Sequence, residues 1–278
     1  MTDSSLLRVR WIAGNTFVEA LRQRFFAFLF LLAAGLAASG MLLRTFNFGQ
    51  SELKFIADFG FGAMFLFGSI LAIVMTVQLF FSELDNRTAL TLLAKPVRRW
   101  EFVLGKFLGI WTLLGVFIAL LGVVLAVMLS IRMPELVESA SRNGEPLPFL
   151  NLKGLGMFCL LQWFRLGVVA ALSLMICSFA QTFLYAVIVS AMGILLCQVQ
   201  SAGVSAFSKP DQETWVRTLA NGVGKVIPDL QLFDLGVPLV LSPAGAPQSA
   251  VLSALGYGAL YMPVLLFITV FLFSDREI

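Results

Sequence analysis

Long apolar runs recur along the whole chain and are separated by polar or charged segments. Six of the runs are long enough to cross a hydrocarbon core of ~30 Å as α-helices, which rise about 1.5 Å per residue. The pattern therefore predicts one all-α transmembrane domain that fills residues 1–278. The six predicted spans lie near residues 25–43, 59–81, 102–130, 155–177, 183–199 and 250–273.

The connection between the fifth and sixth spans, residues 200–249, is long enough to hold structure of its own. Apolar positions recur in it at helical spacing until Pro228, and a second apolar stretch covers residues 230–241. We predict one or two amphipathic helices that lie on the outer membrane surface. A small ordered cap without a role of its own is the alternative. The first pattern is set by Trp215, Leu219, Val223 and Val226.

The composition is that of a domain embedded in lipid. Hydrophobic residues make up 59% of the 278 positions and charged residues 13%, whereas soluble domains hold roughly half apolar and about a quarter charged residues. The chain has no histidine, and its three cysteines, Cys159, Cys177 and Cys197, lie inside apolar runs. We therefore expect no disulfide framework, no metal site and no other cofactor in this chain. The modest net charge of +3 comes without a basic exposed domain, which argues against nucleic-acid binding.

The positions of lysine and arginine predict the orientation of the chain. With the amino terminus inside, ten of these residues fall on inner segments and eight on outer ones. The first two inner segments hold their charges close to the ends of the spans, so we expect both termini in the cytoplasm. A cleaved signal peptide is the alternative for the first run, because Ala37, Ser39 and Gly40 are small. The run is longer than the usual core of a signal peptide, and a charged segment precedes it.

The segment between the second and third spans predicts a short helix on the cytoplasmic surface. Glu83 and Arg87 stand four positions apart with the acid first, which is a favourable helix pair. Pro96 disfavours helical geometry at Lys95, so the helix ends there after about twelve residues, ~18 Å. The predicted helix and its end comprise Glu83, Asp85, Arg87, Thr88, Leu90, Leu92, Leu93, Lys95 and Pro96. A basic corner and the start of the third span follow, with Arg98, Arg99, Glu101, Gly105 and Lys106.

Two interpretations of this surface helix are open from its pattern alone. It can be a positively charged loop that only sets the topology of the chain. It can also be a rigid element that passes movement from a cytoplasmic partner into the two spans that it joins. The spacing Gly105-x-x-x-Gly109 just beyond it permits close contact between helices, although such spacing is common by chance in membrane helices.

Arg165 falls near the middle of the fourth predicted span, beside Gln162 and Trp163. An arginine at mid-bilayer costs ~2.5–3.5 kcal/mol on insertion scales, so such residues usually face a cavity or a partner. Arg165 and Gln162 are therefore our candidates for a polar site inside the membrane. In the alternative, the span starts later or is broken, and the Arg165 side chain reaches outward to the interface.

The chain contains no nucleotide-binding loop of the G-x-x-x-x-G-K-[ST] type. Such a loop needs converging backbone amides, a lysine and a magnesium-binding hydroxyl. Gly105-Lys106 is followed by Phe107 and lacks the upstream glycine, and Gly224-Lys225 fails likewise. We therefore expect no ATPase activity in this chain.

The run at residues 83–106, E-L-D-N-R-T-A-L-T-L-L-A-K-P-V-R-R-W-E-F-V-L-G-K, resembles the signature of ABC-2 type transporter permeases. In that family an acidic residue and a Thr-Leu run lead to Lys-Pro, a basic pair, Glu-Phe and Gly-Lys. Residues 5–24 resemble the amphipathic amino-terminal helix of the branch that includes permeases of multicopper-enzyme maturation and gliding motility. The matching positions are Asn15, Thr16, Phe17, Glu19, Leu21, Arg22 and Arg24, together with Ile227-Pro228-Asp229-Leu230 before the last span.

The resemblance implies a six-helix permease subunit of an ATP-binding cassette exporter in the bacterial inner membrane. It implies a second permease copy or paralogue and separate ATPase subunits, which bind ATP and Mg and receive the surface helix at residues 83–95. Closure of the ATPases would switch the permease between inward- and outward-accessible states. A non-transporting scaffold or mechanotransmission subunit, acting on an outer-surface partner, is the main alternative, and a secondary transporter would require inverted repeats. The substrate is left open.

Overall fold

The computed structural model describes residues 2–42, 52–85, 98–143, 147–207 and 227–274, together with single positions between 215 and 224. This part of the chain is helical, without strands, and contains six helices long and apolar enough to cross a membrane. The prediction of an all-α domain with six spans is therefore confirmed. The six helices are α2 (Arg24–Leu42), α3 (Glu52–Asp85), α5 (Arg99–Asn143), α6 (Leu152–Phe179), α7 (Phe183–Phe207) and α10 (Gln248–Ser274).

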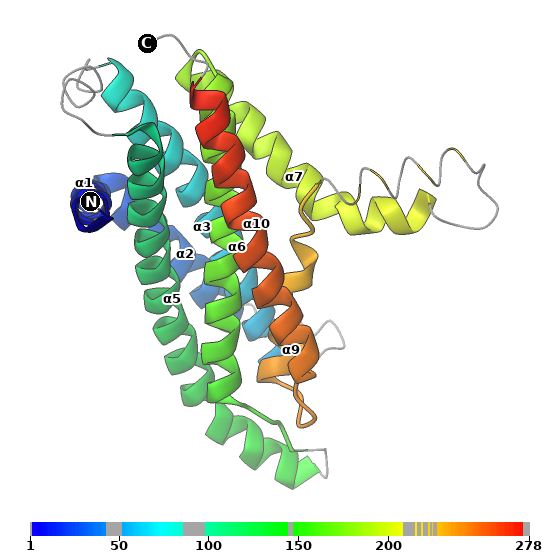
Figure 1. The fold of residues 1–278 in the computed structure, drawn as a ribbon. Coiled ribbons are helices and arrows are strands. Elements are labelled where there is room, and N and C mark those ends of the chain that lie inside the picture. Colours follow the sequence, from blue (N-terminus) through cyan, green and yellow to red (C-terminus); the bar gives the residue numbers. More distant parts are fainter. Residues whose placement is uncertain are drawn as a thin grey trace.

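Several spans continue as helices beyond the apolar runs that predict them. The 45 residues of α5 extend ~68 Å at about 1.5 Å per residue, so this helix projects well beyond a ~30 Å hydrocarbon core. Its last turns bend away from the rest of the helix (Figure 1), and the helix contains Pro134, which has no backbone N–H to donate. The α7 helix likewise runs past residue 199 to Phe207 and diverges from the other spans (Figure 1).

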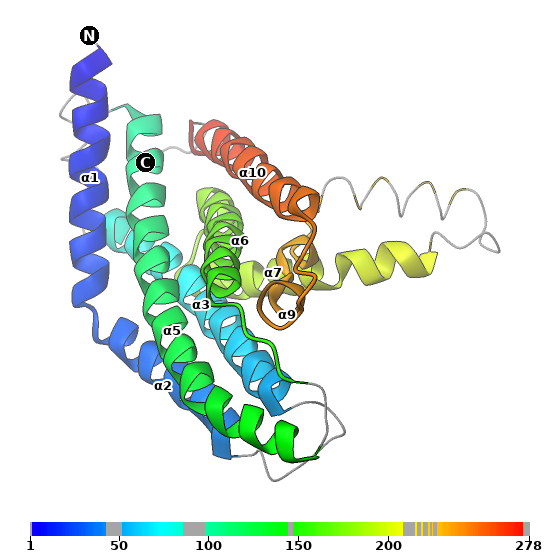
Figure 2. The same ribbon diagram turned by 90° about the horizontal axis from the view of Figure 1, so that it is seen from below.

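The amino-terminal helix α1 (Thr2–Arg22) lies across the bundle, and a break at Gln23 separates it from α2 (Figure 1, Figure 2). Its side toward the bundle buries Val9 and Ala20. Its other side exposes large apolar side chains, which suits a helix that lies in a membrane interface. The exposed set comprises Leu6, Leu7, Trp11, Val18 and Leu21.

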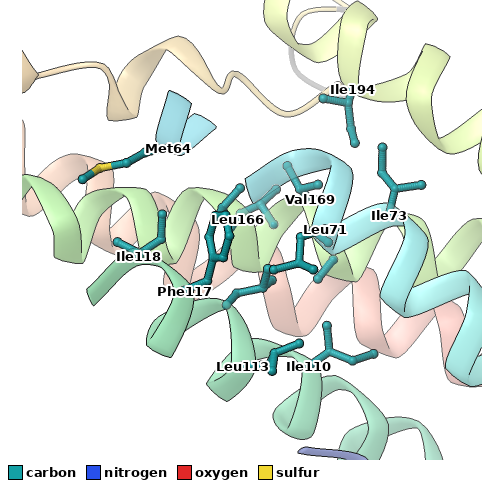
Figure 3. Packing of buried hydrophobic residues seen from close by; sticks show 14 of the residues in the cluster. Met64, Leu71, Ile73, Ile110, Leu113, Phe117, Ile118, Leu166, Val169 and Ile194 are labelled. Atoms are coloured by element: carbon teal, nitrogen blue, oxygen red, sulfur yellow. The ribbon is translucent and has the colours of Figure 1, made fainter. Parts of the chain in front are cut away.

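The hydrophobic core lies where α3, α5 and α6 meet (Figure 3). Leu71 of α3, Phe117 of α5 and Leu166 of α6 are among its fully buried side chains. Lipid tails are as apolar as these side chains, so close packing and dispersion, more than exclusion of water, hold membrane helices in place. The core therefore fixes the arrangement of three central helices, and the other helices add to its sides.

A pair of tryptophans joins α5 to α6 along the bundle. The indole N–H of Trp163 donates to the backbone oxygen of Trp111 at 2.8 Å, and the indole N–H of Trp111 donates to the backbone oxygen of Trp163 at 3.2 Å. The two rings stack with their centroids 4.4 Å apart and an angle of 14° between their planes. Both tryptophans are partly buried, and because each indole N–H finds its acceptor on the other helix, the pair fixes the position of α5 along α6.

The connection before α10 folds onto the bundle. It contains the 3₁₀ turn η2 (Gln231–Phe233) and the short helix α9 (Gly236–Val240). Phe233 and Val240 are fully buried, and their elements contact α6, α3 and α10. The stretch 230–241 is therefore not an amphipathic helix on the membrane surface, because Leu230, Phe233, Leu239 and Val240 pack inside the protein and Leu232 alone of its large apolar side chains is exposed. The pattern from Trp215 to Val226 lies mostly outside the described residues.

An ion pair ties α3 to the far end of α5. Arg132 Nη2 donates to Glu52 Oε1 at 2.6 Å, and Arg132 also contacts Glu135. We expect Arg132→Ala to lower the free energy of unfolding in detergent by about 1–3 kcal/mol, because Glu52 loses a charged hydrogen-bond partner. Glu135→Ala is the matched control, since the Glu135 side chain is 65% exposed, and a change below about 0.5 kcal/mol is expected. Equal thermal unfolding midpoints for the two variants would contradict this prediction.

Candidate functional site

The predicted surface helix lies in the sequence between α3 and α5. The α3 helix runs without a break through Glu83 to Asp85, so this segment begins as a continuation of the second span. The α5 helix then begins at Arg99. The side chains of Glu83 and Asp85 lie outside the described residues, as do Arg87, Thr88, Leu90, Leu92, Leu93, Lys95 and Pro96. Their role in coupling therefore stays a prediction.

Glu101 organises the first turn of α5. It is fully buried, and its Oε2 accepts the backbone N–H of Arg98 at 3.2 Å. An acid at this position, bonded to the N–H of the capping residue, forms half of a capping box. The other oxygen, Oε1, accepts Nη2 of Arg8 from α1 at 2.9 Å. One carboxylate thus holds the start of α5 against α1.

Arg99 connects the same turn to the end of α10. Its Nη1 donates to the backbone oxygen of Phe273 at 2.9 Å, where a cation also compensates the helix dipole. The ring of Phe273 stacks on Phe102 with centroids 6.1 Å apart and meets the edge of Phe80 from α3 at 5.7 Å. Lys106, which ends the predicted set at this corner, is buried. The residues that directly follow the predicted surface helix therefore contact α1, α3 and α10.

Gly105 and Gly109 form the surface on which α1 crosses α5. A Cβ atom on Gly105 would lie 2.7 Å from Cβ of Ile12, and one on Gly109 would lie 2.7 Å from both the Ala13 carbonyl oxygen and Cβ of Thr16. Residues four apart share a face of a helix, so both glycines meet α1 together. The Gly-x-x-x-Gly spacing in the sequence is therefore a contact within this chain.

A cavity with a volume of about 380 Å³ opens between α3, α6, α7 and the turn before α9. Sites for small ligands commonly measure about 300–1,000 Å³, so its size is at the lower end of that range. Its polar lining side chains are Asp58 of α3, Gln162 and Arg165 of α6, Gln198 of α7 and Asp234 before α9. Its apolar walls include Phe61, Phe65 and Val237.

Arg165 is buried at this cavity, with 2% of its surface exposed. Its guanidinium carbon lies 3.7 Å from the centre of the Phe65 ring, and its Nη2 donates to Oε1 of Gln198 at 2.8 Å. The α6 helix continues unbroken from Leu152 to Phe179, so the fourth span is not broken at Arg165. The predicted pair of Gln162 and Arg165 does line one polar site, and its use by a ligand stays a prediction.

The two carboxylates of the cavity are more exposed than the arginine. Asp58 and Asp234 are both exposed, and their negative charges act on each other, while Lys54 partly offsets the charge of Asp58. Asp234 and Asp229 also act electrostatically on Arg165. The site thus combines a buried guanidinium with an acidic rim. No group of three or more His, Cys, Asp or Glu side chains that could hold a metal ion occurs within the described ranges.

The motif at residues 227–230 positions the turn that carries Asp234. The Asp229 side chain accepts the backbone N–H of Gln231 at 2.9 Å, an Asx turn. The backbone N–H of Asp229 donates to the Tyr257 hydroxyl of α10 at 2.9 Å, and the Gln231 side chain donates to the backbone oxygen of Gln198 at 2.9 Å. These bonds hold the turn between α10 and α7.

A family comparison identifies this architecture. A model described as ABC-2 family transporter protein matches residues 10–277. The chain belongs to the ABC-2 family of transporter proteins. The resemblance found in residues 83–106 is thereby confirmed, and the ABC-2 membrane domain is a transport permease domain without a nucleotide-binding site of its own. Among curated proteins no match to this chain is found.

Sequence reasoning identified Arg165 and Gln162 of this ABC-2 protein's cavity but missed the other polar members. Asp58 directly precedes the predicted second span, where a charged residue is ordinary. Gln198 stands at the end of the predicted fifth span, which is also an ordinary place for a polar residue. Asp234 is an isolated acid inside the apolar stretch 230–241, and this signal could have identified it.

Proposed function

We propose that this chain is the membrane-spanning permease subunit of an ATP-binding cassette transporter that a separate ATPase subunit drives. The observation that carries the proposal is the junction at the start of α5, where Glu101 bonds to α1 and Arg99 bonds to α10. A displacement of the segment just before this junction would move α5 through the backbone and two further helices through these bonds. Force applied at one place on the cytoplasmic side would therefore reach three helices.

The polar cavity favours transport over a scaffold role. Burying an arginine in a membrane span costs free energy, and a scaffold has no function that requires such a residue. The α3 helix carries Asp58, Phe61 and Phe65 of the cavity and continues to Asp85 at the start of the surface segment. One unbroken helix thus connects the cavity wall to the predicted docking segment, so an ATPase stroke that shifts α3 would change the cavity.

In this proposal the transporter lies in a bacterial inner membrane with both termini in the cytoplasm. The assembly contains a second permease copy or a paralogue, together with two ATPase subunits that bind ATP and Mg. This chain contributes no covalent chemistry, and its part is to convert the ATPase stroke into export or translocation of a substrate.

A crosslinking experiment tests the proposed coupling. Thr88 or Ala89 is replaced by cysteine in a background without the three native cysteines, and the protein is crosslinked to ATPases encoded beside it, with and without ATP. We expect a nucleotide-sensitive crosslink to one ATPase. Glu138→Cys is the matched control, because Glu138 is exposed at the opposite end of α5, and no crosslink is expected there. Absence of any crosslink from residue 88 or 89 in folded, correctly oriented protein would overturn the proposal.

A further inference from the structure

We propose that the cavity between α3, α6 and α7 binds a zwitterionic group, with an anionic oxygen at Arg165 and an ammonium at the acidic rim. The inference names the ligand class of the site described above, and it rests on the proposed function for the transport step. Binding itself requires only this chain and can be measured without an ATPase.

Arg165 is a buried cation that forms no ion pair within the described part of the chain. Its contacts are the neutral amide of Gln198 and the face of Phe65, and its Nε has no hydrogen-bond partner. A buried charge without an anion is costly, and a guanidinium binds a carboxylate or phosphate with two parallel hydrogen bonds. The free Nε and the cavity beside it therefore fit one anionic oxygen group.

Gln162 and the rim carboxylates fit the other half of the ligand. Oε1 of Gln162, a residue with 1% of its surface exposed, also lacks a hydrogen-bond partner and can accept from an ammonium or hydroxyl. Asp58 and Asp234 repel each other, so a cation between them is favoured, with Asp234 the stronger site because Lys54 acts on Asp58.

The charge balance selects a zwitterion over a simple ion. Two carboxylates, Asp58 and Asp234, and one guanidinium, Arg165, give the cavity a net charge of −1 (two negative charges and one positive). An anion without its own ammonium would meet the acidic rim on the way to Arg165. A cation without an acid group would leave the buried guanidinium unpaired. A group that carries both charges satisfies both ends of the site.

The dimensions fit a small group. A volume of about 380 Å³ holds a lipid headgroup or a small free zwitterion. The apolar walls, Phe61, Phe65 and Val237, cover the carbon atoms between the two charges. Phospholipid headgroups and soluble zwitterions share this chemistry, so the experiment has to distinguish the two sources.

Native mass spectrometry of the purified full-length protein tests the proposal with three probes. They are phosphatidylethanolamine, phosphatidylglycerol with the same acyl chains, and water-soluble glycerophosphoethanolamine. We expect at least one of the two ethanolamine probes to bind about tenfold more tightly than phosphatidylglycerol (~1.4 kcal/mol). Binding of the lipid alone supports a headgroup as the ligand, and binding of the soluble probe supports a free zwitterion. Equal binding of phosphatidylglycerol, or no binding of either ethanolamine probe, would overturn the proposal.

Substitutions assign the binding to this cavity. Asp234→Asn keeps the shape of an exposed side chain, and we expect about tenfold weaker binding of the ethanolamine probe. Arg165→Gln is expected to weaken it at least as much, and the exposed Lys153→Gln on the same helix is the control without effect. Unchanged binding to Asp234→Asn overturns the proposal even if the buried Arg165 variant fails to fold. Such a result leaves the ATPase crosslink from residue 88 unaffected, so the two proposals fail separately.

Discussion

Replacing Gly109 with leucine is expected to detach α1 from α5. Even a Cβ atom at this position would lie 2.7 Å from the Ala13 carbonyl oxygen, and a backbone atom cannot move aside without moving α1. Overpacking of this kind costs about 1–3 kcal/mol, and more when the neighbouring atoms cannot rearrange. Trypsin cleavage after the exposed Arg22 and Arg24 should then rise at least about tenfold, since each ~1.4 kcal/mol raises the detached fraction tenfold.

Gly14→Ala is the matched control on α1 itself. A Cβ atom there would meet nothing within 4 Å, so the substitution changes only the helix propensity of α1. Alanine is favoured over glycine inside a helix by about 0.5–1 kcal/mol, and cleavage should stay the same or fall slightly. If trypsin cleaves Gly109→Leu at the wild-type rate, the contact with α5 does not hold α1 in place and the prediction is wrong.

Loss of the Glu101 carboxylate is expected to free the start of α5 from α1. Glu101→Ala removes the acceptor for the Arg98 backbone N–H and the ion-pair partner of Arg8. We expect a loss of about 2–3 kcal/mol in the free energy of unfolding, measured as a lower thermal unfolding midpoint in detergent. Glu101→Gln keeps an oxygen acceptor but no charge, so its effect should lie between wild type and Glu101→Ala.

The same variant tests transmission in the assembled transporter. A cysteine at position 58 reports on the cavity rim through its alkylation rate, and we expect that rate to change with ATP. Glu101→Ala should reduce this change, because α1 no longer follows the start of α5, while the unbroken α3 helix still connects position 58 to the predicted docking segment. Glu138→Ala, on the same helix but 65% exposed, should leave it intact. If the alkylation rate in Glu101→Ala changes with ATP as much as in the wild type, the Glu101 carboxylate is not needed for coupling.

The spans were predictable because each is one continuous apolar run whose length matches a bilayer. The ends of the helices were less predictable, because a helix can continue through polar residues until a helix-breaking residue or a tertiary contact ends it. The α7 helix passes residue 199 in this way and ends at Phe207. The stretch 230–241 was assigned to the membrane surface because local pattern alone cannot show that its apolar side chains face α6.

Part of the candidate site was likewise predictable from local sequence, and part of it depends on tertiary packing. Arg165 could be identified because a charge inside an apolar run is unusual. Its cavity partners could not, because packing of α3, α7 and the turn before α9 brings Asp58, Gln198 and Asp234 to it. Glu101 stands in a family motif, yet its partner Arg8 is 93 positions away and only the fold joins them.

The reciprocal tryptophan pair joins α5 and α6 firmly, whereas α7 is held less firmly to the bundle. Sliding α5 along α6 would break both indole hydrogen bonds together, at a cost of about 0.5–1.5 kcal/mol for each bond between partly buried groups. Few side chains of α7 are buried in the bundle, although Gln198 accepts Nη2 of Arg165 at 2.8 Å and its backbone oxygen accepts the Gln231 side chain at 2.9 Å. A stroke that enters at the start of α5 should therefore carry α1, α5, α6 and α10 together, and the cavity should change its width at the α7 wall. The buried side chains of α7 are Ala186, Ser190, Ile194 and Cys197.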